Sequence, residues 1–142
     1  MKIRRLSIAD YEALVGLWEK AKLPYKARGR DSKEEIAAQM AANPQFFLGV
    51  FEGDRLVGAV VLSSDMRRGW INRLAVDPEF RRRGIAKALI AEAEQVLKES
   101  GIKVFAVHIE NWNMISKELF RKCGYVEHRD ITYFSKRESN EV

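Results

Sequence analysis

Hydrophobic and polar residues alternate with two different periods along the first half of the chain. Apolar residues three and four apart predict a helix that begins near Ser7 or Asp10, and a second helix that begins at Ser32, where Glu35 completes a capping box. Gly53 and Asp54 separate two apolar runs and predict a hairpin. Short apolar runs predict four strands in this half, at residues 2–6, 46–52, 55–63 and 69–76.

The pattern in the second half predicts one long helix, followed by a strand, a shorter helix and two closing strands. Apolar residues on one stripe predict a helix at residues 84–100, which Gly101 ends. A strand at 104–109 and a helix at 113–123 follow, and two closing strands are predicted at 125–128 and 131–135. The element order is then βααβββαβαββ. Its fourth strand, long helix and fifth strand form one crossover between parallel neighbours, in an α+β fold whose other strands are mostly antiparallel.

Length and composition predict one domain. The chain has 142 residues, of which 46% are hydrophobic, and only residues 136–142 lack a pattern, so we expect them to be frayed. The first residues carry no apolar segment typical of a signal peptide, and no apolar run is long enough to span a bilayer. Cys123 is the only cysteine, which favours a cytoplasmic protein without disulfides.

The charge pattern favours an anionic small molecule as a partner. The net charge of +5 is small for a nucleic-acid-binding protein, and three of the positive charges fall in one short loop, so the pattern argues against nucleic acid. His108, His128 and Cys123 lack the spacing of metal ligands, and no metal is expected.

The segment "LAVDPEFRRRGIAKALI", from Leu74 to Ile90, places three arginines between an apolar strand and an apolar helix. A helix N-terminus carries free N–H groups and the positive end of the helix dipole, so it binds anions. Gly84 would let the backbone approach a phosphate, and Lys87 would add charge. A solvated basic loop before a surface helix is the alternative interpretation.

Two motifs extend this interpretation. Arg81-x-x-Gly84-x-Ala86 resembles the Arg/Gln-x-x-Gly-x-Gly/Ala signature of the GCN5-related N-acetyltransferases, and "NMISKELFRKCGY", from Asn113 to Tyr125, resembles that family's Asn-x-x-Ala-x-x-Leu-Tyr-x-x-x-Gly-Phe segment. The predicted element order also fits the family, so the resemblance covers nearly the whole chain. It implies a GNAT-like mixed sheet, largely antiparallel and flanked by helices, with a central parallel βαβ crossover.

The resemblance also assigns residues to the donor, acetyl-CoA, whose pyrophosphate the loop would hold and whose pantetheine would pair with the end of the fourth strand. The Leu74 N–H would donate to the thioester carbonyl. Asn113 would contact the cofactor arm, although it is equally a helix N-cap residue, and the two roles are compatible. The residues assigned to acetyl-CoA are Leu74, Ala75, Val76, Arg81, Arg82, Arg83, Gly84, Ile85, Ala86, Lys87, Asn113 and Phe120.

The catalytic residues follow less directly. Many relatives carry a basic glutamate on the fourth strand, but "WINRLAV" contains no acid. His108 stands where the similar ribosomal-protein N-terminal acetyltransferases have a glutamate, five residues before the motif asparagine, and a histidine is a competent base at neutral pH. We expect it among apolar neighbours on a central strand, where a core histidine is the alternative. Phe120 stands where the family's tyrosine gives a proton to the thiolate, so Tyr125, Tyr133 or solvent would replace it.

The sequence therefore predicts an acetyl-CoA-dependent N-acetyltransferase in which a primary amine attacks the donor directly in a ternary complex. A protein N-terminus is the first choice of acceptor, on the position of His108 alone. A small-molecule amine, such as a polyamine, an aminoglycoside or an amino acid, is the second. The rival class is a degenerate domain that only binds acyl-CoA, which Phe120 and the acid-free fourth strand support. A second copy of the chain is a further candidate partner, and a membrane is not.

Overall fold

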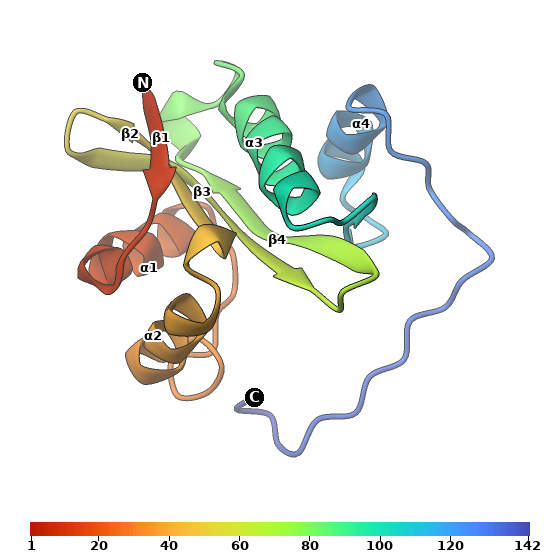
Figure 1. Ribbon diagram of the computed structural model, residues 1–142, viewed down its shortest axis with the longest axis horizontal. Helices are drawn as coiled ribbons and strands as arrows, with labels where there is room; N and C mark the ends of the chain where they lie inside the picture. Colours follow the sequence, from red (N-terminus) through yellow and green to blue (C-terminus); the bar gives the residue numbers. More distant parts are fainter.

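A five-stranded sheet, with the strand order β1-β2-β3-β4-β5, forms the centre of the computed structural model, which describes all 142 residues (Figure 1). Neighbouring strands are antiparallel except β4 and β5, which are parallel. The strands are β1 (Lys2–Arg5), β2 (Phe47–Glu52), β3 (Arg55–Ser64), β4 (Arg68–Val76) and β5 (Val104–Ala106).

β3 is the central strand because its sequence is apolar on both faces. Residues 56–62 are all buried, as expected of a strand that is covered on both sides. β3 pairs with β2 through the predicted hairpin, in which Gly53 adopts a φ of +59°, and with β4 on its other side. The α+β fold and the first four strands that the sequence predicts are therefore confirmed.

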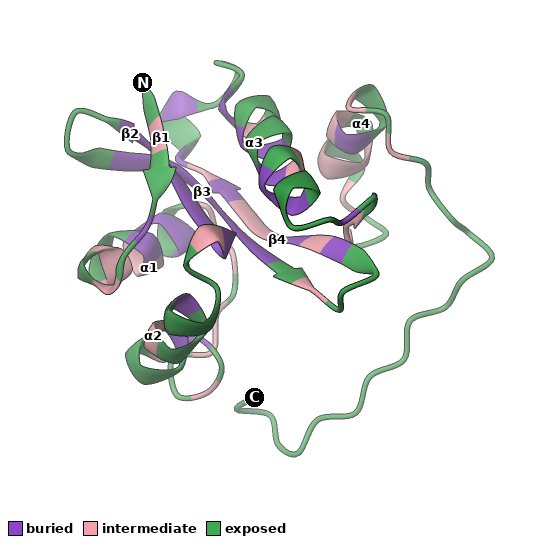
Figure 2. Cartoon of the chain, in the orientation of Figure 1, coloured by how far each residue is buried: buried purple, intermediate pink, exposed green.

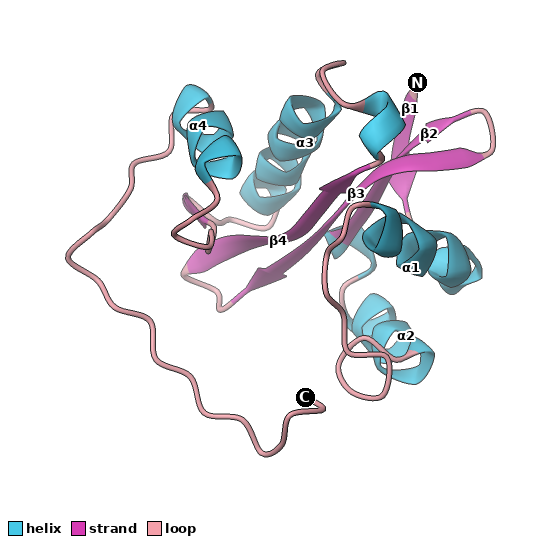
Figure 3. Cartoon of the chain, turned by 180° about the vertical axis from the view of Figure 1, so that it is seen from behind, coloured by secondary structure: helices cyan, strands magenta, loops and turns pink.

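Helices cover both faces of this sheet (Figures 1 and 3). Helices α1 (Tyr11–Lys20) and α2 (Lys33–Ala42) lie on one face, and α3 (Ile85–Glu99) lies on the other with α4 (Met114–Lys122) beside it. Helices α1 and α3 turn their buried apolar residues toward the sheet, and Figure 2 shows these residues as purple segments. Three short 3₁₀ turns precede α1, β2 and α3, at Ile8–Asp10, Pro44–Phe46 and Pro78–Phe80.

The predicted crossover forms, but it lies at one edge of the sheet. β4 and β5 pair over only three positions, which end at Trp70 and Ala106, and no strand pairs with the far side of β5. β5 is three residues long, whereas the apolar pattern predicts a strand to residue 109. Beyond Trp70, the edge of β4 that faces β5 therefore has no partner strand.

The two closing strands, predicted at 125–128 and 131–135, are not formed. The chain after α4 contains no helix or strand and runs in an extended arc back toward α2 (Figure 1). Apolar alternation is only half of what a strand requires, because its backbone groups also need a neighbouring edge. Here those groups face solvent, and the apolar side chains of the arc stay exposed, namely Val126, Ile131, Tyr133 and Phe134.

Candidate functional site

The loop before α3 has an unusual backbone that leaves room for a ligand. Gly84, the N-cap residue of α3, adopts a φ of +78°, and Arg82 adopts a φ of +65°. A Cβ built on Gly84 would have no protein atom within 4 Å and would project into open space. Gly84 thus combines a left-handed conformation with a clear approach to the helix N-terminus.

Free donors and unpaired cations surround this opening. The Ala88 N–H donates to the Gly84 carbonyl over 3.0 Å, whereas the preceding N–H groups of α3 have no backbone acceptor. The three arginines of the loop and Lys87 in the first turn of α3 are exposed, and none of them takes part in an ion pair: Arg81, Arg82, Arg83 and Lys87. Free N–H groups and uncompensated positive charge suit a diphosphate. A bound diphosphate would offset the repulsion among these four cations.

A buried carboxylate holds the turn that leads into this loop. Asp77 is 1% exposed, and it accepts hydrogen bonds from the Glu79 N–H at 3.0 Å and from Arg55 Nη2 at 2.9 Å. Burial raises the pKa of this carboxyl, but these hydrogen bonds and the nearby charges of Arg55 and Lys20 outweigh burial and hold the pKa below its usual value. Asp77 stays ionised and fixes where β4 ends.

The open edge of β4 lies just before this turn. Two residues of β4, Arg73 and Leu74, stand opposite Val60 of β3, so the strand contains a β-bulge. Ala75 and Val76 pair with β3, and β5 has already left the sheet at this level. The segment Leu74–Val76 thus has one backbone edge without a partner strand, and its pairing with pantetheine stays a prediction.

Asn113 and Phe120 lie on α4, on the other side of the gap between β4 and β5. Asn113 is the N-cap residue of α4, and its side chain accepts the Ser116 N–H at 3.1 Å. The capping role is confirmed, and the contact with acetyl-CoA stays a prediction. Phe120 is 4% exposed and packs edge-on against Tyr125, with 5.1 Å between the ring centroids. It therefore belongs to the core of the protein.

His108 does not lie among apolar core residues, so that part of the prediction is wrong. It follows the end of β5 by two residues and is exposed, because β5 ends earlier than its apolar pattern suggests. Its ring lies between Trp70 of β4, at 4.6 Å, and Tyr133 of the C-terminal arc, at 4.9 Å between ring centroids. The imidazole is thus accessible from solvent and contacts two aromatic rings.

The two tyrosine candidates have different surroundings. Tyr125 is half-buried, and its hydroxyl donates to a carboxylate oxygen of Glu94 on α3 over 2.7 Å. Burial, together with the hydrogen bond and charge of Glu94, raises the pKa of Tyr125 far above its usual value. The phenol proton of Tyr125 therefore stays in the hydrogen bond to Glu94. Tyr133 is 67% exposed, and its ring contacts that of His108.

Arg73 is a residue of the site that sequence reasoning missed. Its Nη2 donates to the Pro24 carbonyl over 2.6 Å, and its guanidinium lies 4.1 Å from the ring centroid of Trp18 on α1. Asn72 turns toward the same face, where its Nδ2 donates to Ser63 Oγ over 2.9 Å. The only signal in the sequence is the pair of polar residues, Asn72 and Arg73, inside the apolar run "WINRLAV", because a bulge is not visible in a strand pattern.

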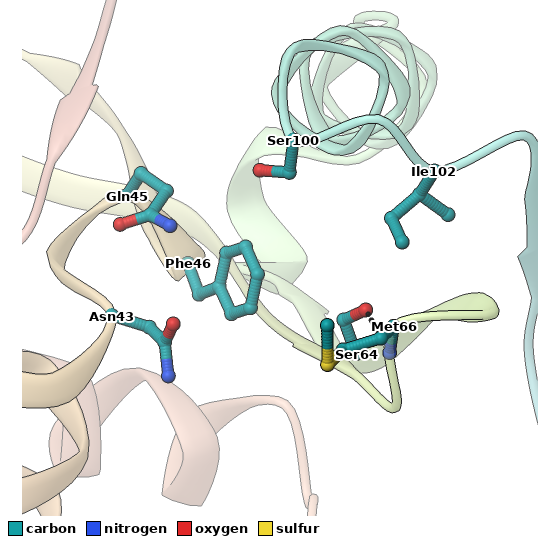
Figure 4. A pocket seen from close by; sticks show the side chains of 7 residues that line it. All are labelled: Asn43, Gln45, Phe46, Ser64, Met66, Ser100 and Ile102. Carbon is teal, nitrogen blue, oxygen red and sulfur yellow. Dashed lines mark hydrogen bonds between the residues drawn. The ribbon is translucent and has the colours of Figure 1, made fainter.

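A cavity of about 270 Å³ lies elsewhere, at the far end of α3 from Gly84 (Figure 4). Its lining contains amide, hydroxyl and apolar side chains but no charged one. It therefore offers nothing to compensate a diphosphate. Its lining residues are Asn43, Gln45, Phe46, Ser64, Met66, Ser100 and Ile102.

The structure contains no cluster of three or more histidine, cysteine, aspartate or glutamate residues arranged to hold a metal ion. None of its helices is both long and apolar enough to cross a membrane.

Comparisons with known proteins agree on one family. The model of the acetyltransferase (GNAT) family matches residues 10–125. The acetyltransferase plu1384 of Photorhabdus laumondii is 33% identical over 138 residues, which cover 96% of this chain and 95% of that protein.

Solved structures of two acetyltransferases also superpose on most of this chain. The PaiA N-acetyltransferase of Thermoplasma acidophilum, in complex with coenzyme A, has a TM-score of 0.75 at 25% identity, with 86% of this chain and 87% of that chain covered. The ribosomal-protein-S18-alanine N-acetyltransferase of Escherichia coli has a TM-score of 0.73 at 17% identity, with 89% and 78% covered, and this likeness shows the fold alone.

Proposed function

Because the chain belongs to the acetyltransferase (GNAT) family, we propose that it transfers the acetyl group of acetyl-CoA to a primary amine by direct attack in a ternary complex. The observation that carries this proposal is the opening at Gly84, with its free N–H groups and unpaired cations, next to the unpaired edge of β4. A thioester is an activated acyl group, and the remaining work falls to residues of this chain.

The first task of these residues is to bind and orient the donor. The N-terminus of α3 and the loop cations would hold the diphosphate, and the edge at Leu74–Val76 would align the pantetheine by backbone hydrogen bonds. The Leu74 N–H is our proposed donor to the thioester carbonyl oxygen. A fixed donor there stabilises the oxyanion that forms when the amine attacks.

The second task is to remove a proton from the acceptor. An amine attacks only after its ammonium form loses a proton, and we assign that proton to His108, which is exposed beside Trp70. As the N–C bond forms, the nitrogen becomes positively charged and loses its second proton to water. The C–S bond then breaks and coenzyme A leaves as a thiolate. Because Phe120 has no proton to give and the Tyr125 proton is held by Glu94, we assign protonation of the thiolate to water.

The proposal also covers the acceptor, the cellular compartment and the oligomeric state. A protein N-terminus is the first choice and a small-molecule amine the second, and a domain that only binds acyl-CoA is the rival class. We also propose that residues 1–142 act as one domain in the cytoplasm, since the single cysteine, Cys123, is unpaired. A homodimer stays a prediction that light scattering on the purified chain would check.

One experiment separates these alternatives. Release of free thiol from acetyl-CoA is measured across a panel of amines and peptides, beside calorimetric binding of acetyl-CoA. Binding together with amine-dependent thiol release supports the enzyme. Binding without release from any amine would support the domain that only binds acyl-CoA.

A further inference from the structure

Arg73 is the only arginine of the chain that is not exposed, and it has no carboxylate partner. Every other arginine lies at the surface. The arginines that form ion pairs with aspartate or glutamate are Arg4, Arg30, Arg55, Arg121 and Arg129, so the most enclosed guanidinium is left without a counter-ion.

The contacts of Arg73 hold its guanidinium in place without neutralising it. Nη2 makes the single hydrogen bond, to the Pro24 carbonyl, and Nε is buried without a partner. The ring of Trp18 supports one side of the group by a cation–π contact. Asp31 is near enough to favour the charged form, but its own carboxylate accepts the Lys26 N–H at 2.8 Å and lies 3.8 Å from Arg30 Nε.

This arrangement is costly for the folded protein on its own. Burial lowers the pKa of Arg73, so the surroundings disfavour its charge, and a buried charge without a counter-ion is destabilising. Arg73 also adopts a φ of +48°, a left-handed conformation that is strained in a residue other than glycine. Such strain is retained mainly where it serves function.

The position of Arg73 connects it with the acceptor. The bulge places Arg73 directly before Leu74, whose N–H we assign to the thioester carbonyl. The guanidinium points to the α1 face of the sheet and contacts the loop between α1 and α2. That loop, residues 22–31, carries four basic residues and one acidic residue, Asp31, which is already engaged. The C-terminal tail contacts this loop, where Lys26 Nζ donates to the Asn140 carbonyl over 2.8 Å, but no carboxylate of the tail forms an ion pair with the loop. The loop therefore favours a carboxylate on the acceptor over a second positive charge.

We propose that the amine acceptor also carries a carboxylate, which pairs with the guanidinium of Arg73. This inference rests on the proposed acetyl transfer and narrows its substrate class. A carboxylate gives Arg73 the charge-assisted partner that the protein does not supply. A free amino acid and an acidic peptide share this chemistry, and a polyamine or an aminoglycoside lacks it.

The test compares each acid with its amide in purified full-length enzyme. Glycine, β-alanine and 4-aminobutyrate, each beside the corresponding amide, vary the distance between amine and carboxylate. Peptides with aspartate or glutamate near the N-terminus, beside asparagine and glutamine versions, represent the second source. The readout is kcat/KM from thiol release, expressed as the ratio of acid to amide, because this ratio does not depend on the fraction of folded enzyme.

Two variants of Arg73 and one control identify the group responsible. Arg73→Met removes the charge at similar length, and Arg73→Lys keeps the charge without the planar fork. Arg5→Met removes an exposed arginine that forms no ion pair. The acid-to-amide ratio of kcat/KM for each variant is divided by the same ratio for the wild type. This division cancels any difference in intrinsic reactivity between the acid and its amide.

We expect the best acid to lose at least tenfold in this ratio in Arg73→Met, an intermediate loss in Arg73→Lys, and no change in Arg5→Met. An unchanged ratio in Arg73→Met, with thiol release intact, would overturn the carboxylate inference and leave the acetyltransferase proposal standing. A wild-type enzyme that prefers polyamines over every acid would do the same. Binding of acetyl-CoA without release from any amine would instead overturn the proposed function, and this inference with it.

Discussion

At Gly84 a missing side chain and a left-handed backbone coincide with the space that a diphosphate requires. Gly84→Val adds a branched Cβ to that space. We therefore expect acetyl-CoA binding, measured by calorimetry, to weaken by more than tenfold, or ~1.4 kcal/mol. Gly101→Val is the matched control: Gly101 follows the other end of α3 with a φ of +83° and equally open surroundings. If folded Gly84→Val binds acetyl-CoA as tightly as folded Gly101→Val does, the phosphate-loop proposal is wrong.

His108 offers a second prediction at the same scale. Glutamine keeps the polarity of the side chain but cannot accept the amine proton, so His108→Gln should lower kcat/KM by roughly 10²-fold. His108→Glu should recover part of this loss and move the lower limb of the pH–rate profile toward acid, because a carboxylate titrates at lower pH than an imidazole. Both are measured by steady-state thiol release.

Binding of acetyl-CoA should hardly change in either variant, because His108 is assigned to the acceptor side. If His108→Gln keeps the turnover and the pH–rate profile of the wild type, the amine loses its proton to water or to another group, and Trp70 and Tyr133 merely enclose an inert ring.

Single residues differ in how far their sequence context reveals them. The open, left-handed position of Gly84 could be expected because Arg81-x-x-Gly84-x-Ala86 resembles a phosphate-binding signature and directly precedes an apolar helix. Arg73 could not, because its direction depends on a bulge, and a bulge arises from the register between β3 and β4. The sequence predicts His108 on a central strand among apolar neighbours, whereas β5 lies at the edge of the sheet and ends two residues before His108.

Among the elements, α3 is linked to the segment after α4 by one hydrogen bond, from the Tyr125 hydroxyl to Glu94. Tyr125→Phe removes it and keeps the edge-on contact with Phe120. We expect a loss of about 1 kcal/mol in the free energy of unfolding, measured in urea, with kcat unchanged. Tyr133→Phe, at an exposed position, is the control for stability. A large fall in kcat for Tyr125→Phe would instead show that its proton takes part in the reaction.

The elements also show where periodicity stops being informative. Helices α1, α2 and α3 and strands β2, β3 and β4 follow from local pattern because each buries several apolar residues. β1 and α4 carry a weaker signal, since β1 buries no residue and α4 buries only Phe120. Residues 125–135 have a comparable alternation, yet they form no strand, because pairing depends on the edge of β5, which offers only three residues. A strand needs a partner that the sequence of the strand does not describe.

At the scale of the whole molecule, the sheet separates the two substrates that we propose. The diphosphate opening lies at the N-terminus of α3, on one face, and Arg73 points to the α1 face. β4 and β5 no longer pair beyond Trp70 and Ala106, and we propose that the two substrates meet at this gap. An acceptor can thus approach from the side opposite to α3, which is why one strand, β4, supplies both the donor edge and the acceptor contacts.

Asp77 connects the end of β4 with β3 and α1. Its carboxylate lies 2.9 Å from Arg55 Nη2 of β3 and 3.7 Å from Lys20 Nζ of α1. Its pKa, like that of Asp10 beside Arg4, is lower in the folded chain than its usual value. The stability that such groups contribute is therefore present above the unfolded pKa of about 4 and is lost as pH falls through the folded pKa.

Asp77→Asn consequently should lower the free energy of unfolding by about 1–2 kcal/mol at pH 7, because asparagine loses the charge-assisted bond to Arg55 while it can still accept the Glu79 N–H. The measurement is thermal unfolding of both proteins between pH 7 and pH 2. As the wild-type carboxyl becomes protonated, it loses the same interaction, so the difference in Tm between wild type and variant should shrink as the pH falls.

Asp130→Asn is the control, at an exposed position without an ion pair, and its Tm should equal that of the wild type at both pH values. A difference for Asp77→Asn that stays constant down to pH 2 would mean that shape, and not charge, is what this residue contributes to the fold.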